Sequence, residues 1–415
     1  MSEATTSGQT VVIVGAGHGS GQAVVSLRQE GWEGRIVLIG EEPYLPYQRP
    51  PLSKKFLAGE IGIDRVEFKA EEAYGPDNAN VDLMLNTRVD AIDRDAKTVT
   101  TDKGETINYD KLLISTGSRV RRLDFLPGAD ADGVCYLRGI DDVENIKRFF
   151  GSGKKAVIVG AGYIGLEVAA VAVKNGVDVT VLEMEERPMA RVTAPLVSDF
   201  YHKVHTEEGV KIRYGVKVTG FEKNDAGELT TVLTEGGEDF SADFAVIGVG
   251  IIPNVELAEA AGLACDNGIL VDDCARTEDP DVFAAGDCTN HPNGHLGKNI
   301  RLESVQNALE QSKSAAAAIC GKEKPYNQVP WFWSDQYDLK LQIVGLSQGY
   351  TDVVVRGNPD ARAFAAFYMK DGELIAVDAI NAAPEFLMSK RLIAQKARPD
   401  PTRLADTSIP MKEVL

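Results

Sequence analysis

The stretch AVIVGAGYIGLEVAA, from Ala156 to Ala170, decides the fold, and a second copy, VVIVGAGHGSGQA, runs from Val11 to Ala23. Each copy opens with a short apolar run that suits a buried strand and continues into a helix-like pattern. Glycines at the junction allow a tight turn, a close approach of backbone to pyrophosphate, and close helix–sheet packing. The phosphate charge then lies at the helix N-terminus, where free N–H groups and the dipole favour anions. Two such motifs predict two bound dinucleotides.

The segments that follow the two motifs also repeat. In each copy a helix, a strand, a hairpin-like stretch and a final apolar strand follow: Arg35 to Gly40, Thr98 to Asp110 and Lys111 to Ser118; then Asp178 to Glu183, Leu229 to Asp243 and Phe244 to Gly250. An aspartate precedes each final strand and a glycine follows it: Asp110 with Gly117, and Asp243 with Gly250. Alternating helix and strand patterns are typical of a parallel βαβ sheet. We therefore predict an α/β fold with two Rossmann-like domains that arose by duplication.

A third region begins after Pro330, where the pattern changes to consecutive strands. The stretch RAFAAFYMKDGELIAVDAIN carries a Lys370-Asp371-Gly372 turn that suits a hairpin, and the helix-like segment APEFLMSKRLIAQKA follows it. We predict a C-terminal α+β domain here, in addition to the two Rossmann-like domains.

The stretch TEDPDVFAAGDC, which ends at Cys288, distinguishes the two nucleotide sites. A strand that ends in Ala-Gly-Asp resembles the second flavin signature of two-dinucleotide flavoproteins, whose aspartate binds the ribityl chain of FAD; here it is Asp287. Because this signature follows the second motif, the FAD domain must be discontinuous. We predict an FAD-binding domain of residues 1–118 and 251–326, an NADH-binding domain of 119–250 between them, and a C-terminal domain of 327–415.

An acidic residue about 20 residues after the first glycine commonly binds the adenosine ribose. Glu183 holds that position in the second copy and Glu41 in the first. A carboxylate also repels a 2′-phosphate, so Glu183 predicts NADH over NADPH. The first copy departs from the pattern, because Ser20 stands where the third glycine is expected.

Charge and composition limit the partners. The net charge of −18 argues against nucleic acid or an anionic membrane as a general partner. The start, MSEATTSGQT, has no secretory pattern, and no apolar run is long enough to span a bilayer. The five cysteines are scattered without a C-x-x-C pair, which favours a reducing compartment and gives no metal or iron–sulfur site. We expect a cytoplasmic monomer.

Six motifs together carry a family resemblance: YLPYQRPPLSK (44–54), GYIGLEVAA (162–170), RVTAP (191–195), GVGIIPN (248–254), AAGDC (284–288) and PWFWSDQY (330–337). They resemble motifs of the NADH-dependent ferredoxin reductases of bacterial oxygenase systems, which have a glutathione-reductase-like fold. The likeness runs from Val11 to about Leu415. It implies hydride transfer from NADH to the flavin N5 atom, followed by one-electron transfers to a 2Fe-2S ferredoxin that serves a haem monooxygenase or a Rieske dioxygenase.

The resemblance also implies roles for single residues. Lys54 corresponds to a lysine beside the flavin N5, and Glu167 to a glutamate that pairs with it and reaches the nicotinamide; these two are the catalytic candidates. A cation near N5 would steady negative charge that develops on the reduced ring. The expected FAD-binding residues are Gly15, Gly17, Gly19, Ser20, Glu41, Lys54, Val89, Thr116, Gly117, Arg138, Asp287, Val305 and Trp333. The expected NADH-binding residues are Gly160, Gly162, Tyr163, Ile164, Gly165, Glu167, Glu183 and Gly250.

The absence of a cysteine pair suggests where electrons go. Disulfide reductases of this fold carry C-x-x-x-x-C near the place of PPLSKKFLAG, whereas the first cysteine here is Cys135. The flavin must therefore pass electrons to an external acceptor, and a separate iron–sulfur protein suits one-electron release. Two alternatives remain: a reductase or oxidase with another acceptor, and an NADH-sensing interaction protein resembling apoptosis-inducing factor.

Docking of an acidic ferredoxin on an acidic chain needs a local basic patch. The candidates are Arg119, Arg121, Arg122, Lys313, Lys340, Lys390, Arg391 and Lys412. The histidines give no convincing metal site. For His202 and His205, three residues apart, a solvated helix face is the expectation.

Overall fold

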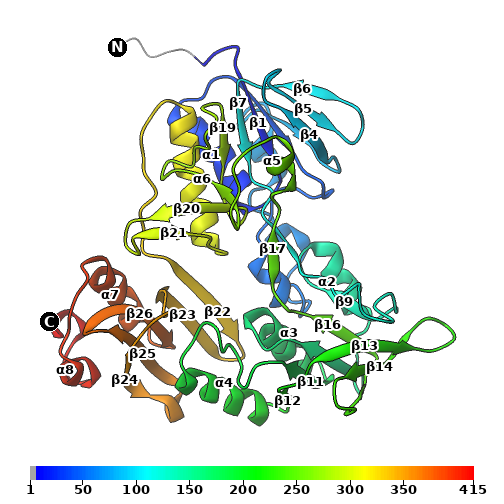
Figure 1. Cartoon of the computed structure of the whole chain (residues 1–415), viewed down its shortest axis with the longest axis vertical. Helices are drawn as coiled ribbons and strands as arrows, with labels where there is room; N and C mark the ends of the chain where they lie inside the picture. The colour runs from blue at the N-terminus through cyan, green and yellow to red at the C-terminus, as the bar shows by residue number, and fades with distance from the viewer. Residues whose placement is uncertain (1–5) are drawn as a thin grey trace. The chain divides into compact units, whose positions relative to one another are not determined.

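The computed structural model describes residues 6–415, which form two compact units (Figure 1). Unit 1 comprises the chain up to Gln48 together with 63–119 and 252–328. Unit 2 comprises 49–62, 120–251 and 329–415. The chain passes between the units after Gln48, Gly62 and Gln328, and also within β8 (Ser118–Val120) and β17 (Ile251–Pro253). Residues 1–5, which begin the N-terminal segment considered above, lie outside the described residues.

The central sheet of unit 1 is parallel, in the order β19-β7-β1-β2-β3. Its strands are β1 (Thr10–Val14), β2 (Arg35–Ile39), β3 (Val81–Met84), β7 (Lys111–Ile114) and β19 (Val282–Ala284). Val11 and Ile13 pack on one face with α1 (His18–Glu30) and α6 (Val305–Ile319), while Val12 and Val14 pack on the other. Burial on both faces explains why β1 reads as a continuous apolar run.

Smaller elements cover the second face of this sheet. An antiparallel sheet is formed by β4 (Val89–Asp93), β5 (Thr98–Thr101) and β6 (Thr106–Asn108). A short mixed sheet is formed by β18 (Ile269–Leu270), β20 (Thr289–Asn293) and β21 (Lys298–Ile300), in which β18 and β20 are parallel. The helix α5 (Glu256–Ala260) lies against β4. Short 3₁₀ turns are η2 (Ile63–Arg65) and η3 (Glu71–Tyr74).

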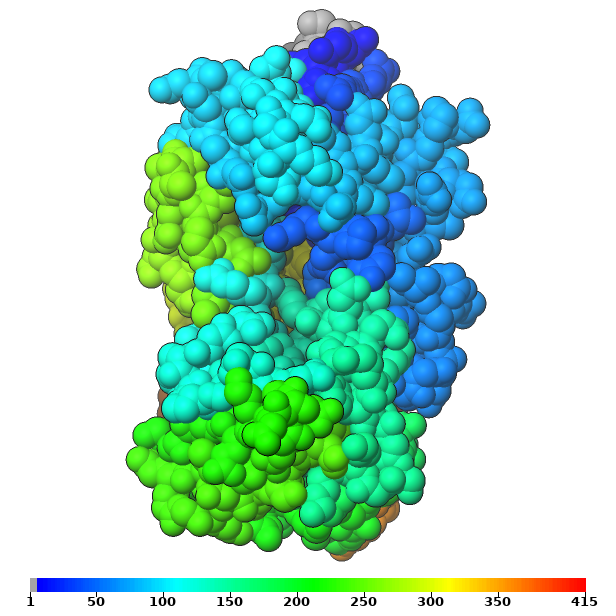
Figure 2. Space-filling model, turned by 90° about the vertical axis from the view of Figure 1, so that its right-hand side faces the viewer, coloured from blue at the N-terminus to red at the C-terminus, as the bar shows by residue number. Residues whose placement is uncertain are grey.

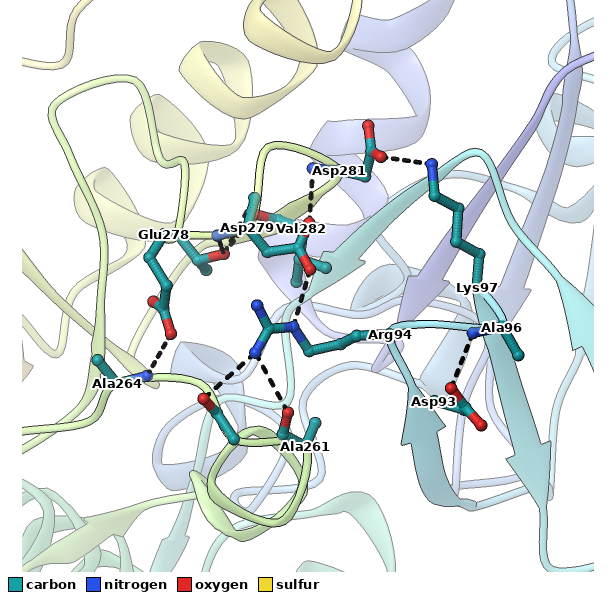
Figure 3. Close-up of polar contacts among 12 residues, drawn as sticks. Asp93, Arg94, Ala96, Lys97, Ala261, Ala264, Glu278, Asp279, Asp281 and Val282 are labelled. Carbon is teal, nitrogen blue, oxygen red and sulfur yellow. Dashed lines mark hydrogen bonds and ion pairs between the residues drawn. The ribbon is translucent and has the colours of Figure 1, made fainter.

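A polar network ties these pieces to β19 (Figure 3). Arg94, after β4, donates to Asp279 at 2.8 Å and to the carbonyls of Ala261 and Gly262. Glu278 accepts from the backbone N–H of Ala264 at 2.9 Å. Three segments that are distant in sequence are thereby fixed around the strand that leads to Asp287.

The first sheet of unit 2 repeats the pattern, in the order β12-β11-β10-β16-β9, all parallel. Its strands are β9 (Val134–Tyr136), β10 (Lys155–Val159), β11 (Asp178–Glu183), β12 (Lys211–Tyr214) and β16 (Phe244–Ile247). Its helices are α2 (Ile140–Lys147), α3 (Tyr163–Lys174) and α4 (Pro195–Glu207), and an antiparallel excursion is formed by β13 (Val218–Lys223), β14 (Leu229–Thr234) and β15 (Phe240–Ser241).

The duplication extends to single hydrogen bonds. Asp110 accepts from the backbone N–H of Thr10 at 2.7 Å, at the start of β1. Asp243 accepts from Lys155 N–H at 2.8 Å, at the start of β10. In both sheets, therefore, the aspartate before the strand that pairs with the motif strand, β7 or β16, binds the backbone at the start of the motif strand. The predicted α/β fold with two Rossmann-like halves is confirmed.

The C-terminal part of unit 2 is an antiparallel sheet, in the order β22-β23-β26-β25-β24. Its strands are β22 (Trp331–Gln336), β23 (Leu339–Gly345), β24 (Asp352–Asn358), β25 (Ala363–Lys370) and β26 (Glu373–Ile380), with η4 (Pro359–Ala361) between β24 and β25. Asp371 and Gly372 both have positive φ, 50° and 82°, so the predicted hairpin turn is present. The elements α7 (Ala383–Ala394), α8 (Pro401–Ala405) and η5 (Met411–Glu413) follow.

A buried arginine fixes the last residues of the chain. Arg356 on β24 is 5% exposed and forms an ion pair with Glu385 at 3.0 Å. Its guanidinium also donates to the carbonyls of Leu404, Asp406 and Ile409. The buried charge is thus fully engaged, as a charge out of water must be.

Candidate active site

The first glycine motif, in unit 1, makes the turn between β1 and α1. Gly15 has φ +105°, and a Cβ there would lie 2.2 Å from the carbonyl oxygen of Ser115, so only glycine fits. Gly17 is the N-cap of α1, forms no side-chain cap, and has open space where a Cβ would be. The backbone N–H groups at the start of α1 are thus left for an anion, as pyrophosphate binding requires.

The third position of this motif is Ser20, which is fully buried in α1. Its hydroxyl has no partner among the described protein groups. The close approach that the pattern assigns to a third glycine occurs instead one residue earlier. A Cβ at Gly19 would lie 2.8 Å from Ser115 Oγ and 3.0 Å from Ser312 Oγ. In this motif the position that leaves no room for a side chain is therefore Gly19, and the third position holds a buried serine.

The other predicted FAD residues of unit 1 gather at the carboxyl edge of the same sheet, where ligands of such folds bind. Thr116 and Gly117 follow β7, and Thr116 Oγ1 donates to the Asn254 carbonyl at 2.8 Å. Asp287 follows β19 and accepts from Ser118 Oγ at 2.8 Å. Glu41 follows β2 and is exposed.

Two further predicted FAD residues of unit 1 lie at the starts of elements. Val305 begins α6, behind an N-cap in which Ser304 accepts from Asn307 N–H. Val89 begins β4 and is buried in the core beside the sheet.

The second glycine motif, in unit 2, follows the usual pattern throughout. Gly160 has φ +104°, and its Cβ would lie 2.4 Å from the Gly248 carbonyl oxygen. Gly162 caps α3 without a side chain and faces open space. A Cβ at Gly165 would lie 2.1 Å from the Gly160 carbonyl oxygen, so the third glycine is required for helix–strand packing here.

Glu183, at the end of β11, is held beside this motif. One carboxylate oxygen accepts from Ala161 N–H at 2.7 Å and the other from Glu185 N–H at 2.9 Å. Ile164 in the first turn of α3 is 44% exposed, and Gly250 after β16 has φ +105°. The predicted NADH residues thus lie around the carboxyl end of one sheet. Tyr163, next to Ile164, packs its ring 5.0 Å from that of Phe332.

An ion pair between the partly exposed Lys54 and the buried Glu167 joins the two catalytic candidates within unit 2. The 3₁₀ turn η1 (Pro50–Ser53) presents Lys54, whose Nζ lies 2.6 Å from Glu167 Oε2. Glu167, in the second turn of α3, is 1% exposed, and its carboxylate also accepts from Ser53 and Ser334. Sequence analysis missed both serines, although Ser53 belongs to PPLSK and Ser334 to PWFWSDQY.

The segment that carries Lys54 lies on the surface beside α2, where Figure 2 shows its blue atoms next to the blue-green atoms of that helix. Lys147 Nζ on α2 is 4.1 Å from the centre of the Phe56 ring. Arg49 donates to the carbonyl of Arg138 at 2.6 Å. Arg138 and Trp333, both predicted to contact FAD, belong to unit 2.

Most of the basic residues considered for ferredoxin docking contact acidic or aromatic neighbours in the structure. Arg119, Arg122 and Lys313 form ion pairs with Glu256, Asp124 and Glu310, respectively, at 2.5–2.7 Å. Lys412 lies 3.7 Å from Glu413, and Lys390 Nζ is 4.1 Å from the centre of the Trp331 ring. The remaining candidates, Arg121, Lys340 and Arg391, are exposed.

The expectation of a solvated helix face was wrong for His205. Its side chain is fully buried, because this face of α4 packs against the C-terminal sheet, where His205 Nε2 contacts Gln336 Oε1 on β22. His202 is half-buried, with Nδ1 2.7 Å from Tyr214 OH. Among residues 6–415, no group of three or more histidine, cysteine or acidic side chains could hold a metal ion, and all five cysteines are free thiols. None of the helices described is long and apolar enough to cross a bilayer.

Comparison with known proteins places this site in a family. The model for pyridine nucleotide-disulphide oxidoreductases matches residues 9–312, and a reductase C-terminal model matches 331–415. Putidaredoxin reductase CamA of Pseudomonas putida is 42% identical over 98% of this chain and 96% of its own. Rhodocoxin reductase of Rhodococcus erythropolis is 40% identical over 97% and 93%.

Two solved structures extend the match to three dimensions. The crystal structure of a covalent putidaredoxin reductase–putidaredoxin complex matches with a TM-score of 0.95 and 42% identity, covering 98% of both chains. The ferredoxin reductase for the CYP199A2 system from Rhodopseudomonas palustris matches with a TM-score of 0.93 and 40% identity, covering 97% of this chain and 99% of its own. The chain therefore belongs to the pyridine nucleotide-disulphide oxidoreductase family, among the putidaredoxin reductase-like ferredoxin reductases of oxygenase systems.

Proposed function

We propose that this protein takes electrons from NADH onto a bound FAD and passes them one at a time to a separate 2Fe-2S ferredoxin that supplies an oxygenase. The observation that carries the proposal is the Lys54–Glu167 ion pair. It occupies the segment where disulfide reductases of this fold carry their cysteines, and the first cysteine of this chain is Cys135. The chain thus offers a fixed cation where disulfide reductases of this fold offer a thiol pair.

Family membership implies FAD and NAD(P) as the bound nucleotides. The residues present fit two dinucleotides. Both motif helices begin at an uncapped glycine with open space beside it, Gly17 and Gly162. In unit 1, the buried hydroxyl of Ser20 has no partner among residues 6–415, which suits a pocket completed by a ligand.

The assignment of each nucleotide follows from the side chains at the two sheet edges. Asp287 and Glu41 would hold FAD hydroxyl groups, with Gly15 and Gly17 at its pyrophosphate. Gly160 and Gly162 would hold the NADH pyrophosphate, and Glu183 its adenosine ribose. The Glu183 carboxylate is already fixed by two backbone N–H groups, so it presents a defined negative charge that a 2′-phosphate would meet. When bound, FAD accepts two electrons from NADH and can release them singly.

The roles of this chain's residues are electrostatic. Glu167 holds the Lys54 ammonium at 2.6 Å, so the cation is fixed before the nucleotides bind. A pre-oriented charge costs no reorganisation when negative charge develops nearby. Ser53 donates to the same carboxylate and helps to fix its position.

Anaerobic rapid mixing tests the proposal in two stages. NADH should abolish the visible absorption of the oxidised flavin, and an oxidised 2Fe-2S ferredoxin added next should restore it while its own cluster is reduced. The same ferredoxin without its cluster is the matched control. Reduced flavin that persists with ferredoxins but is rapidly oxidised by oxygen or a quinone would favour the other-acceptor alternative. A reduced form that no acceptor oxidises would favour a sensing role.

A further inference from the structure

Beyond the Lys54 pair, Glu167 is the end of a longer chain of hydrogen bonds in unit 2. Ser334 on β22 donates to Glu167 Oε1 at 2.5 Å, and Gln336 Nε2 on the same strand lies 3.1 Å from Ser334 Oγ. Gln336 Oε1 is 2.8 Å from His205 Nε2, and Tyr337 OH is 3.1 Å from His205 Nδ1. Ser334 and Gln336 are two residues apart, so they share one face of the strand.

The hydrogen bonds of this series can run in only one donor-to-acceptor direction, because it ends at a carboxylate. A carboxylate only accepts hydrogen bonds, so Ser334 donates its single O–H group to Glu167 and must accept from Gln336. The Gln336 amide must then present its oxygen to His205, which requires a proton on His205 Nε2. That leaves Nδ1 as an acceptor for Tyr337 OH.

Burial supports the neutral histidine that this direction requires. Ser334 and His205 are fully buried and Gln336 is 2% exposed. Removal from water lowers the pKa of His205 to about 4, so the ring is uncharged at neutral pH. A neutral ring has one donor and one acceptor, and both are used here.

The far end of the chain is held in an uncommon backbone conformation. Tyr337 has φ +56°, which is rare for an aromatic residue, in the two-residue turn between β22 and β23. The Tyr337 ring lies 5.4 Å from Lys174 Nζ and 5.0 Å from the His205 ring. Such strain persists only where the surroundings determine it, so the position of this hydroxyl is specified.

We infer that Ser334, Gln336 and His205 are positioning residues that orient the Glu167 carboxylate toward Lys54. The inference rests on the proposed function, because it assigns these residues to the reduction of the flavin by NADH. Every donor in the chain points toward Glu167, and dipoles aligned in this way strengthen one another. Without Ser334, Glu167 Oε1 would lose its hydrogen bond, and Lys54 and Ser53 would hold the carboxylate through Oε2 alone.

The holoenzyme and two variants test this role. Ser334→Ala removes the donor itself, and Gln336→Met breaks the chain one step further away at similar volume. Ser389→Ala is the matched control, since Ser389 is a fully buried serine on α7 that donates to a backbone carbonyl. We expect the rate of flavin reduction by NADH to fall about tenfold in Ser334→Ala and less in Gln336→Met, with the NADH dissociation constant nearly unchanged.

Two readouts do not depend on turnover. The midpoint potential of the flavin should become more negative in Ser334→Ala, because a less neutralised carboxylate offsets more of the Lys54 charge. Nitrogen NMR of histidine-labelled protein should show His205 as one neutral tautomer with the proton on Nε2, and Gln336→Met should disturb that signal.

The outcomes separate this inference from the proposed function. If NADH fails to reduce the wild-type flavin, the proposed function is wrong. If NADH reduces it and Ser334→Ala matches Ser389→Ala in rate and potential, the positioning role is wrong. A His205 proton on Nδ1, or a charged ring at neutral pH, would also overturn the direction of the chain. Should Ser334→Ala fail to fold, Gln336→Met carries the same comparison.

Discussion

At the third position of the two glycine motifs, unit 1 has Ser20 and unit 2 has Gly165, and their surroundings differ in kind. Around the first motif, the buried hydroxyls of Ser20 and Ser312 lack partners among the described protein groups. Around the second, the carboxylates of Glu183 and Glu167 are satisfied by protein donors. The same sequence pattern thus gives one site with unpartnered buried hydroxyl groups and one whose acidic side chains are already held by protein donors.

The difference suits the proposed reaction, in which one nucleotide stays bound and the other exchanges. When a ligand supplies hydrogen bonds to buried polar groups that lack partners, the folded protein gains stability, and the ligand is retained. A site whose carboxylates are already fixed needs little rearrangement to bind and release. The two motifs and their surroundings can differ in packing, in proton affinity and in charge, and each difference has its own test.

The largest effect is expected from exchanging the third residues. Gly165→Ser would place a Cβ about 2.1 Å from the Gly160 carbonyl oxygen, so the free energy of unfolding should fall by at least about 3 kcal/mol and NADH binding should be lost. Ser20→Gly should change it by about 1 kcal/mol or less, because a helical glycine costs little more than the unpaired hydroxyl. Denaturant unfolding followed by circular dichroism, with NADH titration, measures both.

Gly165→Ala is the control for that exchange, since it adds the Cβ without the hydroxyl and should behave like Gly165→Ser. If Gly165→Ser unfolds at the wild-type denaturant concentration and still binds NADH, the two motifs do not differ in packing.

A second prediction contrasts two buried histidines. His205 in unit 2 has partners at both ring nitrogens, whereas His291 in unit 1, 1% exposed, has none among the described groups. Burial lowers the pKa of His291 to about 4. The unfolded chain binds a proton below about pH 6.5, so stability is full above that pH and is lost as the pH falls toward 4.

His291→Phe removes this proton uptake while it keeps a ring beside Tyr326, whose ring centre lies 5.3 Å away. Between pH 7 and pH 5 the wild type should lose about 2 kcal/mol more unfolding free energy than the variant. Denaturation curves at the two pH values measure the difference. Equal losses in both proteins would mean that His291 is protonated in the folded state or has a partner there.

Sequence reasoning worked where local chemistry dominates. The apolar runs gave β1, β10 and β11, the glycines gave both turns, and the Lys370-Asp371-Gly372 turn was read correctly, because these features depend on neighbouring residues. The three-residue strand β9 was missed, since so short a segment has no periodicity.

The parts of the site that escaped prediction depend on contacts between distant segments. Glu167 meets Ser53, 114 residues away, and Ser334, 167 residues away, and no spacing within either motif reveals this. His205 was misjudged for the same reason: its helix face is buried only because β22 packs on it. The charges proposed for docking were likewise read without their acidic neighbours, such as Glu256 beside Arg119.

The smallest expected effect tests charge at the two ribose positions. Glu183 is anchored by two backbone N–H groups, whereas Glu41 is exposed at the corresponding place in unit 1. Glu183→Ala removes a fixed negative charge that would face a 2′-phosphate, so the preference for NADH over NADPH, measured as the ratio of kcat/KM values, should shrink about tenfold. Glu222→Ala, which removes an exposed carboxylate on β13, controls for net charge. Glu41→Ala should leave the ratio unchanged and instead weaken FAD retention during dialysis. If Glu183→Ala leaves the ratio intact, anchoring of that carboxylate does not select the nucleotide, and the contrast between the two motifs reduces to packing.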